Sequence, residues 1–345
     1  MRFVVCSAVL SSLLAGAQQD AAALSDQAQS MAREKRFDEA EQLWREAIRQ
    51  SPNYFPALFN LGYAYFTQQK FASAEALLRQ AAQVARDDFN TRYLLGLTLA
   101  KLGKSEDALI AWRDALRIQP QNLRLMQIMS VEYSKGRYFG EAAALARRAL
   151  DTKGDDPNLF FLTIKAYQDA GNNASAAEVA QRAVRQFPES ARANFEYGFQ
   201  LQNQGKIPGA LDHLKRAMKA DPSYEEPFFF YGSLLLDQGN GEEAITYLRT
   251  AIKNRKDYVP ARVALARALM SLQKWNDAIA ELNATIEMDP KQPQPHLLLS
   301  QIYFRLGDEA KAKIEQRNSL RLRRETPALL EGVQPRPFPA TKPAQ

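Results

Sequence analysis

The sequence predicts an all-α protein, an α-solenoid of about nine helix-turn-helix hairpins. Three observations predict this fold class: a repeat of 34 residues, two helical patterns in each repeat, and small side chains at fixed positions of the repeat. The repeats follow one another over residues 21–326 without an inserted or deleted residue. The nine units start at residues 21, 55, 89, 123, 157, 191, 225, 259 and 293.

Small side chains mark where the helices are expected to touch. Alanine occupies one position in all nine units, a second position carries Ala, Thr or Ser, and a third is small in every unit but one. A side chain larger than Ala at a close helix crossing forces the helices apart, at a typical cost of ~1–3 kcal/mol. The three positions are Ala40, Ala74, Ala108, Ala142, Ala176, Ala210, Ala244, Ala278 and Ala312; Ala47, Ala81, Ala115, Ala149, Ala183, Ala217, Ala251, Thr285 and Ser319; and Ala28, Gly62, Gly96, Ser130, Ile164, Gly198, Gly232, Ala266 and Ser300.

The first helix of each unit shows one apolar stripe and then a break. In the second unit, Leu58, Leu61, Gly62 and Tyr65 recur with the period of an α-helix. Five units carry Gly at the break, where glycine readily takes the left-handed conformation that ends a helix. These glycines are Gly103, Gly171, Gly205, Gly239 and Gly307.

The second helix begins shortly after the break. From Ser105 to Asp107 a hydroxyl and two acids stand where the exposed amides of a helix start favour them. Five units then carry Pro near their end, which stops the helix: Pro52, Pro120, Pro188, Pro222 and Pro290. Helices of about 12 to 14 residues are marginal alone, so we expect neighbouring hairpins to stabilise them.

The small, large and Pro positions, as in NLGYAYFTQQKFASAEALLRQA at residues 60–81, resemble the tetratricopeptide repeat family over 306 of the 345 residues. The resemblance implies a right-handed superhelix whose first helices line a concave groove, and a role in binding proteins or peptides. Arg86, Gly154, Lys256 and Arg324 replace the unit-end Pro. The ninth unit has Gln316 where other units have Trp44, Trp112 or Leu248, and we interpret it as a polar terminal cap.

The two ends of the chain fall outside the repeats. Residues 1–17 combine Arg2, a short apolar run and Ala15-Gly16-Ala17, which predicts a secretory signal peptide and a periplasmic or secreted location in the cell envelope. An uncleaved anchor is the alternative. Cys6, the only cysteine, would be lost with the signal. Residues 327–345 are rich in Pro and predict an extended or disordered tail.

Composition and motifs argue against catalysis and against nucleic-acid binding. The formal charge of +6 is spread along the chain, unlike the clustered basic face of a nucleic-acid binder. His213 and His296 lie in different units, and no nucleophile elbow or phosphate loop is present. Acidic pairs fall at the starts of second helices, where the dipole favours them. We therefore expect no enzyme, no cofactor and no metal site.

Function is expected on the first helices. Phe59, Tyr63 and Phe66 form a stripe rotated by roughly 100° from the core stripe, and the resemblance places such residues in the groove. Aromatic and basic side chains are typical hot spots of protein binding. The alternative is that these rings pack between adjacent first helices. The candidate site residues are Phe59, Tyr63, Phe66, Tyr93, Lys101, Arg124, Lys135, Phe161, Lys165, Arg192, Phe195, Phe199, Phe229 and Arg267.

Charges at the corresponding positions indicate an acidic partner. Eight are basic and three acidic, the further members being Arg33, Arg305, Asp169, Glu226 and Asp237. Two hypotheses follow: a scaffold that binds protein or peptide partners in the groove, and a binding protein for an anionic polymer such as an exported polysaccharide. The first is favoured. The oligomeric state does not follow from the sequence.

Overall fold

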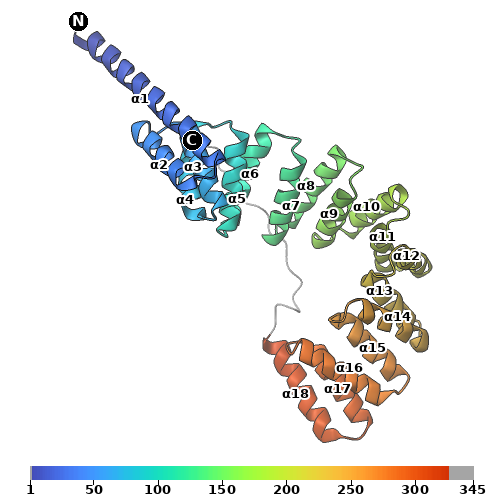
Figure 1. Ribbon diagram of the computed structural model, residues 1–345. Helices are drawn as coiled ribbons and strands as arrows, with labels where there is room; N and C mark the ends of the chain where they lie inside the picture. The colour runs from blue at the N-terminus through green and yellow to red at the C-terminus, as the bar shows by residue number, and fades with distance from the viewer. Residues whose placement is uncertain (1, 326–345) are drawn as a thin grey trace. The chain divides into compact units, whose positions relative to one another are not determined.

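The computed structural model describes the backbone of residues 2–325 and the side chains of residue 16 and residues 18–325. This range contains eighteen α-helices and no strand (Figure 1). The helices are α1 (Arg2–Arg33), α2 (Phe37–Gln50), α3 (Phe55–Thr67), α4 (Phe71–Val84), α5 (Phe89–Lys101), α6 (Ser105–Ile118), α7 (Leu123–Lys135), α8 (Phe139–Thr152), α9 (Pro157–Asp169), α10 (Asn173–Gln186), α11 (Ala191–Asn203), α12 (Ile207–Ala220), α13 (Glu225–Asp237), α14 (Gly241–Asn254), α15 (Val259–Ser271), α16 (Trp275–Met288), α17 (Pro293–Arg305) and α18 (Glu309–Glu325).

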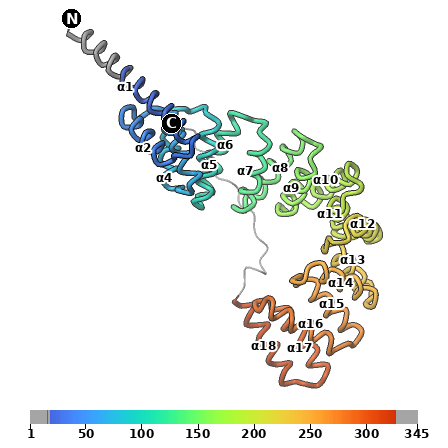
Figure 2. The backbone as a smooth tube through the Cα atoms, in the orientation of Figure 1, coloured from blue at the N-terminus to red at the C-terminus, as the bar shows by residue number. Residues whose placement is uncertain are grey.

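The chain forms two compact units of stacked hairpins. The first unit runs through Lys153 and contains α1 to α8, and the second begins at Gly154 and contains α9 to α18. Within each unit a first helix is followed by an antiparallel second helix and then by the next hairpin (Figure 2). The predicted fold class, an all-α solenoid of helical hairpins, is confirmed.

The helix boundaries repeat with a spacing of 34 residues. From α3 onward, first helices start at 55, 89, 123, 157, 191, 225, 259 and 293, and second helices start at the same spacing from residue 37 to residue 309. Helix α1 is longer than the other first helices because it begins at Arg2 and includes the expected signal segment. Cleavage near Gln18 stays a prediction. In the part of the chain that the structure describes, no helix is both long and apolar enough to span a bilayer. The predicted tail at 327–345 lies outside the described residues.

The small side chains lie at the helix crossings, as expected. All nine alanines of the first set are buried, from Ala40 to Ala312. At Gly96 the approach is closest, since an added Cβ would lie 2.2 Å from Nε1 of Trp112 on the partner helix of the same hairpin. Glycine there leaves room for the indole, which is buried and donates to the Tyr93 carbonyl at 3.1 Å.

The turn between the two helices has one conformation in all nine hairpins. The five predicted glycines have positive φ, and so do the non-glycine residues at the same position of the other four hairpins. These are Lys35 (φ 65°), Gln69 (φ 60°), Arg137 (φ 67°) and Gln273 (φ 58°). The backbone hydrogen bonds that close the turn therefore impose the left-handed conformation even where the side chain opposes it.

Capping differs from the prediction. Ser105 does not cap α6, because its hydroxyl donates to Glu132 Oε1 at 2.6 Å, although Glu106 and Asp107 do lie in the first turn. Side-chain caps occur instead mainly at first helices, where Asp88 accepts from the Thr91 amide and Asn122 from the Leu125 amide.

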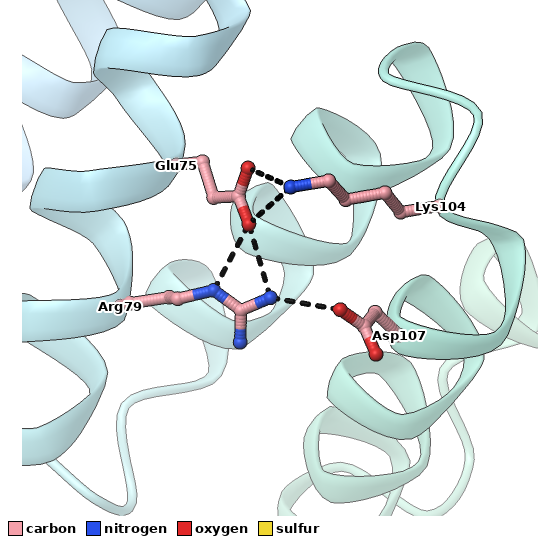
Figure 3. Close-up of polar contacts among 4 residues, drawn as sticks. All are labelled: Glu75, Arg79, Lys104 and Asp107. Carbon is pink, nitrogen blue, oxygen red and sulfur yellow. Dashed lines mark hydrogen bonds and ion pairs between the residues drawn. The ribbon is translucent and has the colours of Figure 1, made fainter.

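Ion pairs add to the stacking of successive hairpins in the first unit. Glu75 on α4 accepts two hydrogen bonds from Lys104 Nζ, at 2.7 and 2.9 Å, and Arg79 reaches Asp107 of α6 at 2.8 Å (Figure 3). Hydrogen bonds from Lys104 and Arg79 hold the pKa of Glu75 below its usual range despite some burial.

Candidate protein-binding surface

We call the surface formed by the outward side chains of the first helices the first-helix face. In the first unit the predicted rings pack mostly within their own hairpins. Phe59 stacks on Phe55 at 6.0 Å, Tyr93 stacks on Phe89 at 5.7 Å, and the half-buried Phe66 meets Phe71 of α4. Tyr63, 53% exposed, is the most open of the predicted rings in this unit. The structure therefore does not gather these rings into one patch.

In the second unit the predicted rings do come together. Phe195 and Phe199 of α11 contact Phe230 of α13 at 5.4 and 5.2 Å, and Phe229 lies 5.0 Å from Phe230. The series extends to Tyr224, 5.4 Å from Phe195, and Tyr258, 5.3 Å from Phe229. We call these six residues the ring cluster: Phe195, Phe199, Tyr224, Phe229, Phe230 and Tyr258.

Three members of the ring cluster were missed in the sequence. Tyr224 and Tyr258 are the last residues of their units, 34 residues apart, and Tyr54 occupies the same position. That recurrence was a signal that could have identified them. Phe230 adjoins Phe229, and only the packing of α11 against α13 shows that it joins the cluster.

The ring cluster contains both packed and partly open rings. Phe195 is 9% exposed and packs between first helices, whereas Phe199, Phe229 and Phe230 are half-buried and keep part of their surface open. Phe161 is different, because it is 7% exposed and the Arg192 guanidinium lies over its ring at 4.3 Å. The ring of the candidate residue Phe161 is thus covered and has little surface open to a partner.

The basic bias expected from the sequence is largely offset in the second unit. Lys165 forms an ion pair with Asp169, Arg192 lies 3.9 Å from Glu196, and Arg267 lies 3.9 Å from Asp237. Glu196 did not enter the sequence count of charges. The net positive charge of this part of the first-helix face is therefore smaller than that count indicated.

The three candidate cations of the first unit, Lys101, Arg124 and Lys135, differ in their ion pairs. Lys135 pairs with Glu132 at 3.1 Å, but Lys101 and Arg124 are exposed and form no ion pair with any described residue. Lys101 lies at the end of α5 and Arg124 at the start of α7.

Two carboxyl groups beside the ring cluster are desolvated. Burial raises the pKa of Glu196, and Arg192 and Gln168 only partly oppose this effect. Burial likewise raises the pKa of Glu226, whose Oε2 is buried without a hydrogen-bond partner among the described residues. Burial also raises the pKa of Tyr224 and of Tyr258. Burial is the main cause of the raised pKa in each of these four groups.

A hollow of about 290 Å³ lies next to the ring cluster on the same face. Phe229 forms one wall, Val259, Pro260, Val263 and Ala264 supply further apolar surface, and Ser233, Arg267, Gln292 and Gln294 stand around it. The space is sufficient for one or two apolar side chains of a partner. Phe229 and Arg267, both predicted from the sequence, meet here.

The two histidines lie in different hairpins, and each contacts a polar side chain of its own hairpin. His213 Nδ1 lies 2.9 Å from Asn194 Oδ1, and burial lowers its pKa. His296 Nδ1 lies 2.6 Å from Glu315. Among the described residues, no three His, Cys, Asp or Glu side chains are grouped so that they could hold a metal ion.

Comparison with known proteins relates this geometry to a family. Tetratricopeptide repeat models match residues 31–97, 89–122, 161–199, 201–257, 235–302 and 293–326. No curated protein matches. Among solved structures, PilW, a type IV pilus biogenesis factor, is 24% identical with a TM-score of 0.52 over 60% of this chain and 94% of PilW. A chain of the APC/C hetero-tetramer Cut9–Hcn1 is 14% identical with a TM-score of 0.56 over 87% of this chain and 60% of that chain.

These two structures show the fold, and the repeat models cover most of the hairpins in sequence. Helix boundaries, buried small side chains and turn conformation repeat with the same period in the structure. The chain belongs to the tetratricopeptide repeat family.

Proposed function

We propose that this protein is a non-catalytic scaffold that binds a protein or peptide partner on the first-helix face of its second unit. Membership of the tetratricopeptide repeat family supports an interaction role, and the Cut9–Hcn1 assembly is a case in which this fold is found together with a partner protein. The partner is expected to lie along α11, α13 and α15.

The observation that carries the proposal is the ring cluster with its neighbouring hollow. Phe229 belongs to both, so half-open aromatic surface and an apolar recess are continuous on α13 and α15. Aromatic side chains that are held in place by packing lose little entropy on binding and dominate the energy of many interfaces. An extended or helical peptide with apolar anchors fits this surface.

The partner's acidity is proposed for the first unit. Lys101 and Arg124 are exposed and form no ion pair with a described residue, so acidic side chains of a partner would be favoured there. Around the ring cluster the contact is expected to be mainly apolar, because Arg192 and Arg267 lie beside acids.

The cell envelope is proposed as the site of action. The signal-like pattern of residues 1–17 supports this location. Intact-mass analysis of the protein purified from its host is expected to show a chain that starts near Gln18. A mass that includes Met1 or Arg2 would contradict cleavage.

Removal of the half-open rings tests the binding surface. A photo-crosslinking residue at Ser233, in the hollow, identifies the partner in the host, and the affinity of the purified pair is then measured. Phe199→Ala with Phe229→Ala is expected to weaken binding at least tenfold, since central aromatic residues each contribute about 2 kcal/mol or more. Ile110→Ala, at an exposed apolar position of α6, is the matched control. Unchanged affinity of the double variant would refute the proposal.

A further inference from the structure

The last hairpin, α17 and α18, lacks a buried side chain that each of the other hairpins has on its second helix. In the eight preceding hairpins one position of the second helix carries a buried residue, such as Trp112, Leu214 or Leu248. Leu248 lies directly against Gly232 and Leu214 against Gly198 of the first helix in the same hairpin. In α18 the corresponding residue is Gln316, which is exposed. The side chain at this position therefore does not pack between α17 and α18.

A hollow of about 1120 Å³ lies at this place. Met270, Trp275, Leu297 and Phe304 supply its apolar surface, and Gln316 is among the polar residues that line it. Phe304 is 70% exposed, the highest value among the large apolar side chains that the structure describes. The last hairpin, interpreted as a polar terminal cap, thus also carries open apolar surface on α17, while α18 is rich in charged residues.

The charges beside the hollow are mainly positive. Arg305 follows Phe304 directly, is exposed and forms no ion pair with a described residue. Lys313 lies on the α18 side, 3.1 Å from Glu309, and both of those side chains are largely exposed. A guanidinium without a partner beside an open aromatic ring favours a carboxylate that arrives with an apolar side chain.

We propose that this hollow is a second docking site, which takes a partner segment with an aromatic or aliphatic anchor next to carboxylates. The anchor lies on Phe304 between Trp275 and Leu297, and the carboxylate is bound by Arg305. The volume of about 1120 Å³ slightly exceeds the ~300–1,000 Å³ typical of ligand pockets and is enough for several residues of a peptide. The site is separate from the ring cluster and does not depend on the function proposed for it.

The test uses two fluorescein-labelled dodecapeptides with the same central Leu and Phe residues, one flanked by Glu and the other by Lys. Fluorescence anisotropy with the full chain is expected to show binding of the Glu peptide at least tenfold tighter than of the Lys peptide, a difference of about 1.4 kcal/mol. Phe304→Ser and Arg305→Glu are each expected to reduce that affinity at least tenfold. Ile110→Ser, an exposed apolar residue of α6, is the matched control.

Gln316→Leu provides the sharper variant because it restores the buried residue found in four preceding hairpins, at Leu78, Leu214, Leu248 and Leu282. It is expected to fill the space, raise the thermal midpoint and abolish binding of the Glu peptide. Loss of binding together with a gain of stability cannot result from unfolding. A variant that is stabilised and still binds would overturn the proposal.

The remaining outcomes are equally decisive. No saturable binding of either peptide, or equal affinity for both, overturns the proposal. Binding that appears only after truncation at Glu325 would mean that residues 326–345 of the same chain occupy the site, and it also overturns a partner site. The Phe199→Ala, Phe229→Ala double variant should bind the Glu peptide as tightly as wild type. A failure of this second docking site can therefore be told apart from a failure of the function proposed for the ring cluster.

Discussion

At the scale of single residues, the turn position shows backbone geometry prevailing over side-chain preference. Gln273 has a φ of 58° in a turn where five other hairpins carry Gly. A non-glycine residue in this conformation destabilises the folded state by roughly 1–2 kcal/mol. Replacing it with Gly recovers only roughly half of this, because Gly loses more conformational freedom on folding.

Gln273→Gly is therefore expected to raise the free energy of unfolding by about 0.5–1 kcal/mol, measured by urea denaturation. The reverse change, Gly103→Ala at φ 74°, should lower it by about 1 kcal/mol. No atom lies within 4 Å of the added Cβ at Gly103, so strain of the backbone is the only cause. If both variants changed the free energy of unfolding in the same direction, this explanation would be wrong.

Glu196 makes stability depend on pH. Because burial raises its pKa in the folded protein, the folded state binds a proton more readily than the unfolded state. Its contribution to stability is fully present below the ordinary value of 4.5 and is lost as pH rises through the raised pKa of the folded state. Glu196→Gln is expected to stabilise the protein at neutral pH, with a gain that disappears in acid.

Thermal midpoints measured across this pH range test the assignment. Glu189→Gln, at an exposed position of the same hairpin stack, is the control and should not change the profile. A difference between Glu196→Gln and wild type that is the same at every pH would show that the carboxyl is not the cause.

At the scale of the helices, Gly96 and Trp112 form a coupled pair. Gly96→Ala would drive a methyl group into the indole and is expected to cost about 3 kcal/mol, while Trp112→Leu alone leaves a cavity and should cost about 2 kcal/mol. Together they recreate the pair Ala266 and Leu282, which is fully buried in another hairpin.

The double variant is thus expected to lose at least 1 kcal/mol less than the sum of the single changes, as measured in a double-mutant cycle by urea unfolding. Additive losses would show that the two helices adjust independently at this crossing.

The buried alanines act at the same scale. Ala176 and Ala210 are fully buried at hairpin crossings of the second unit. Replacement of either by Leu should lower stability by about 1–3 kcal/mol through overpacking and so lower the thermal midpoint measured by circular dichroism. An unchanged midpoint in both variants would contradict close packing at this position. Asp212→Leu, at an exposed position of α12, gives a control for the added apolar side chain.

At the scale of the whole molecule, stability is shared between neighbouring hairpins. A solenoid holds each repeat through its own packing and the interfaces with the repeats on either side. The last hairpin has a neighbour on one side among the described residues, and it has an unfilled hollow. We expect amides of α17 and α18 to exchange with deuterium faster than those of α13 and α14, measured by mass spectrometry. Equal protection throughout the second unit would contradict this gradient.

The sequence alone determined the hairpin frame and its close contacts. Helix starts from residue 55 to residue 293 follow the predicted units, and each predicted alanine is buried. This succeeded because helix periodicity, glycine turns and proline stops act within one unit, and because nine copies repeat the same local signals. The left-handed turn at Gln69 or Gln273 had no such signal, since glycine is absent there.

Only the tertiary structure decided which candidate residues are open. Arg192 covers Phe161, Tyr224 contacts Phe195 of α11, and Tyr258 contacts Phe229 of α13. The hollow beside Phe304 likewise depends on what Gln316 leaves unfilled. These features arise from contacts between side chains about one repeat apart, whose distances depend on how hairpins stack. Periodicity places a residue on a helix face, but the neighbouring hairpin determines whether that face remains exposed.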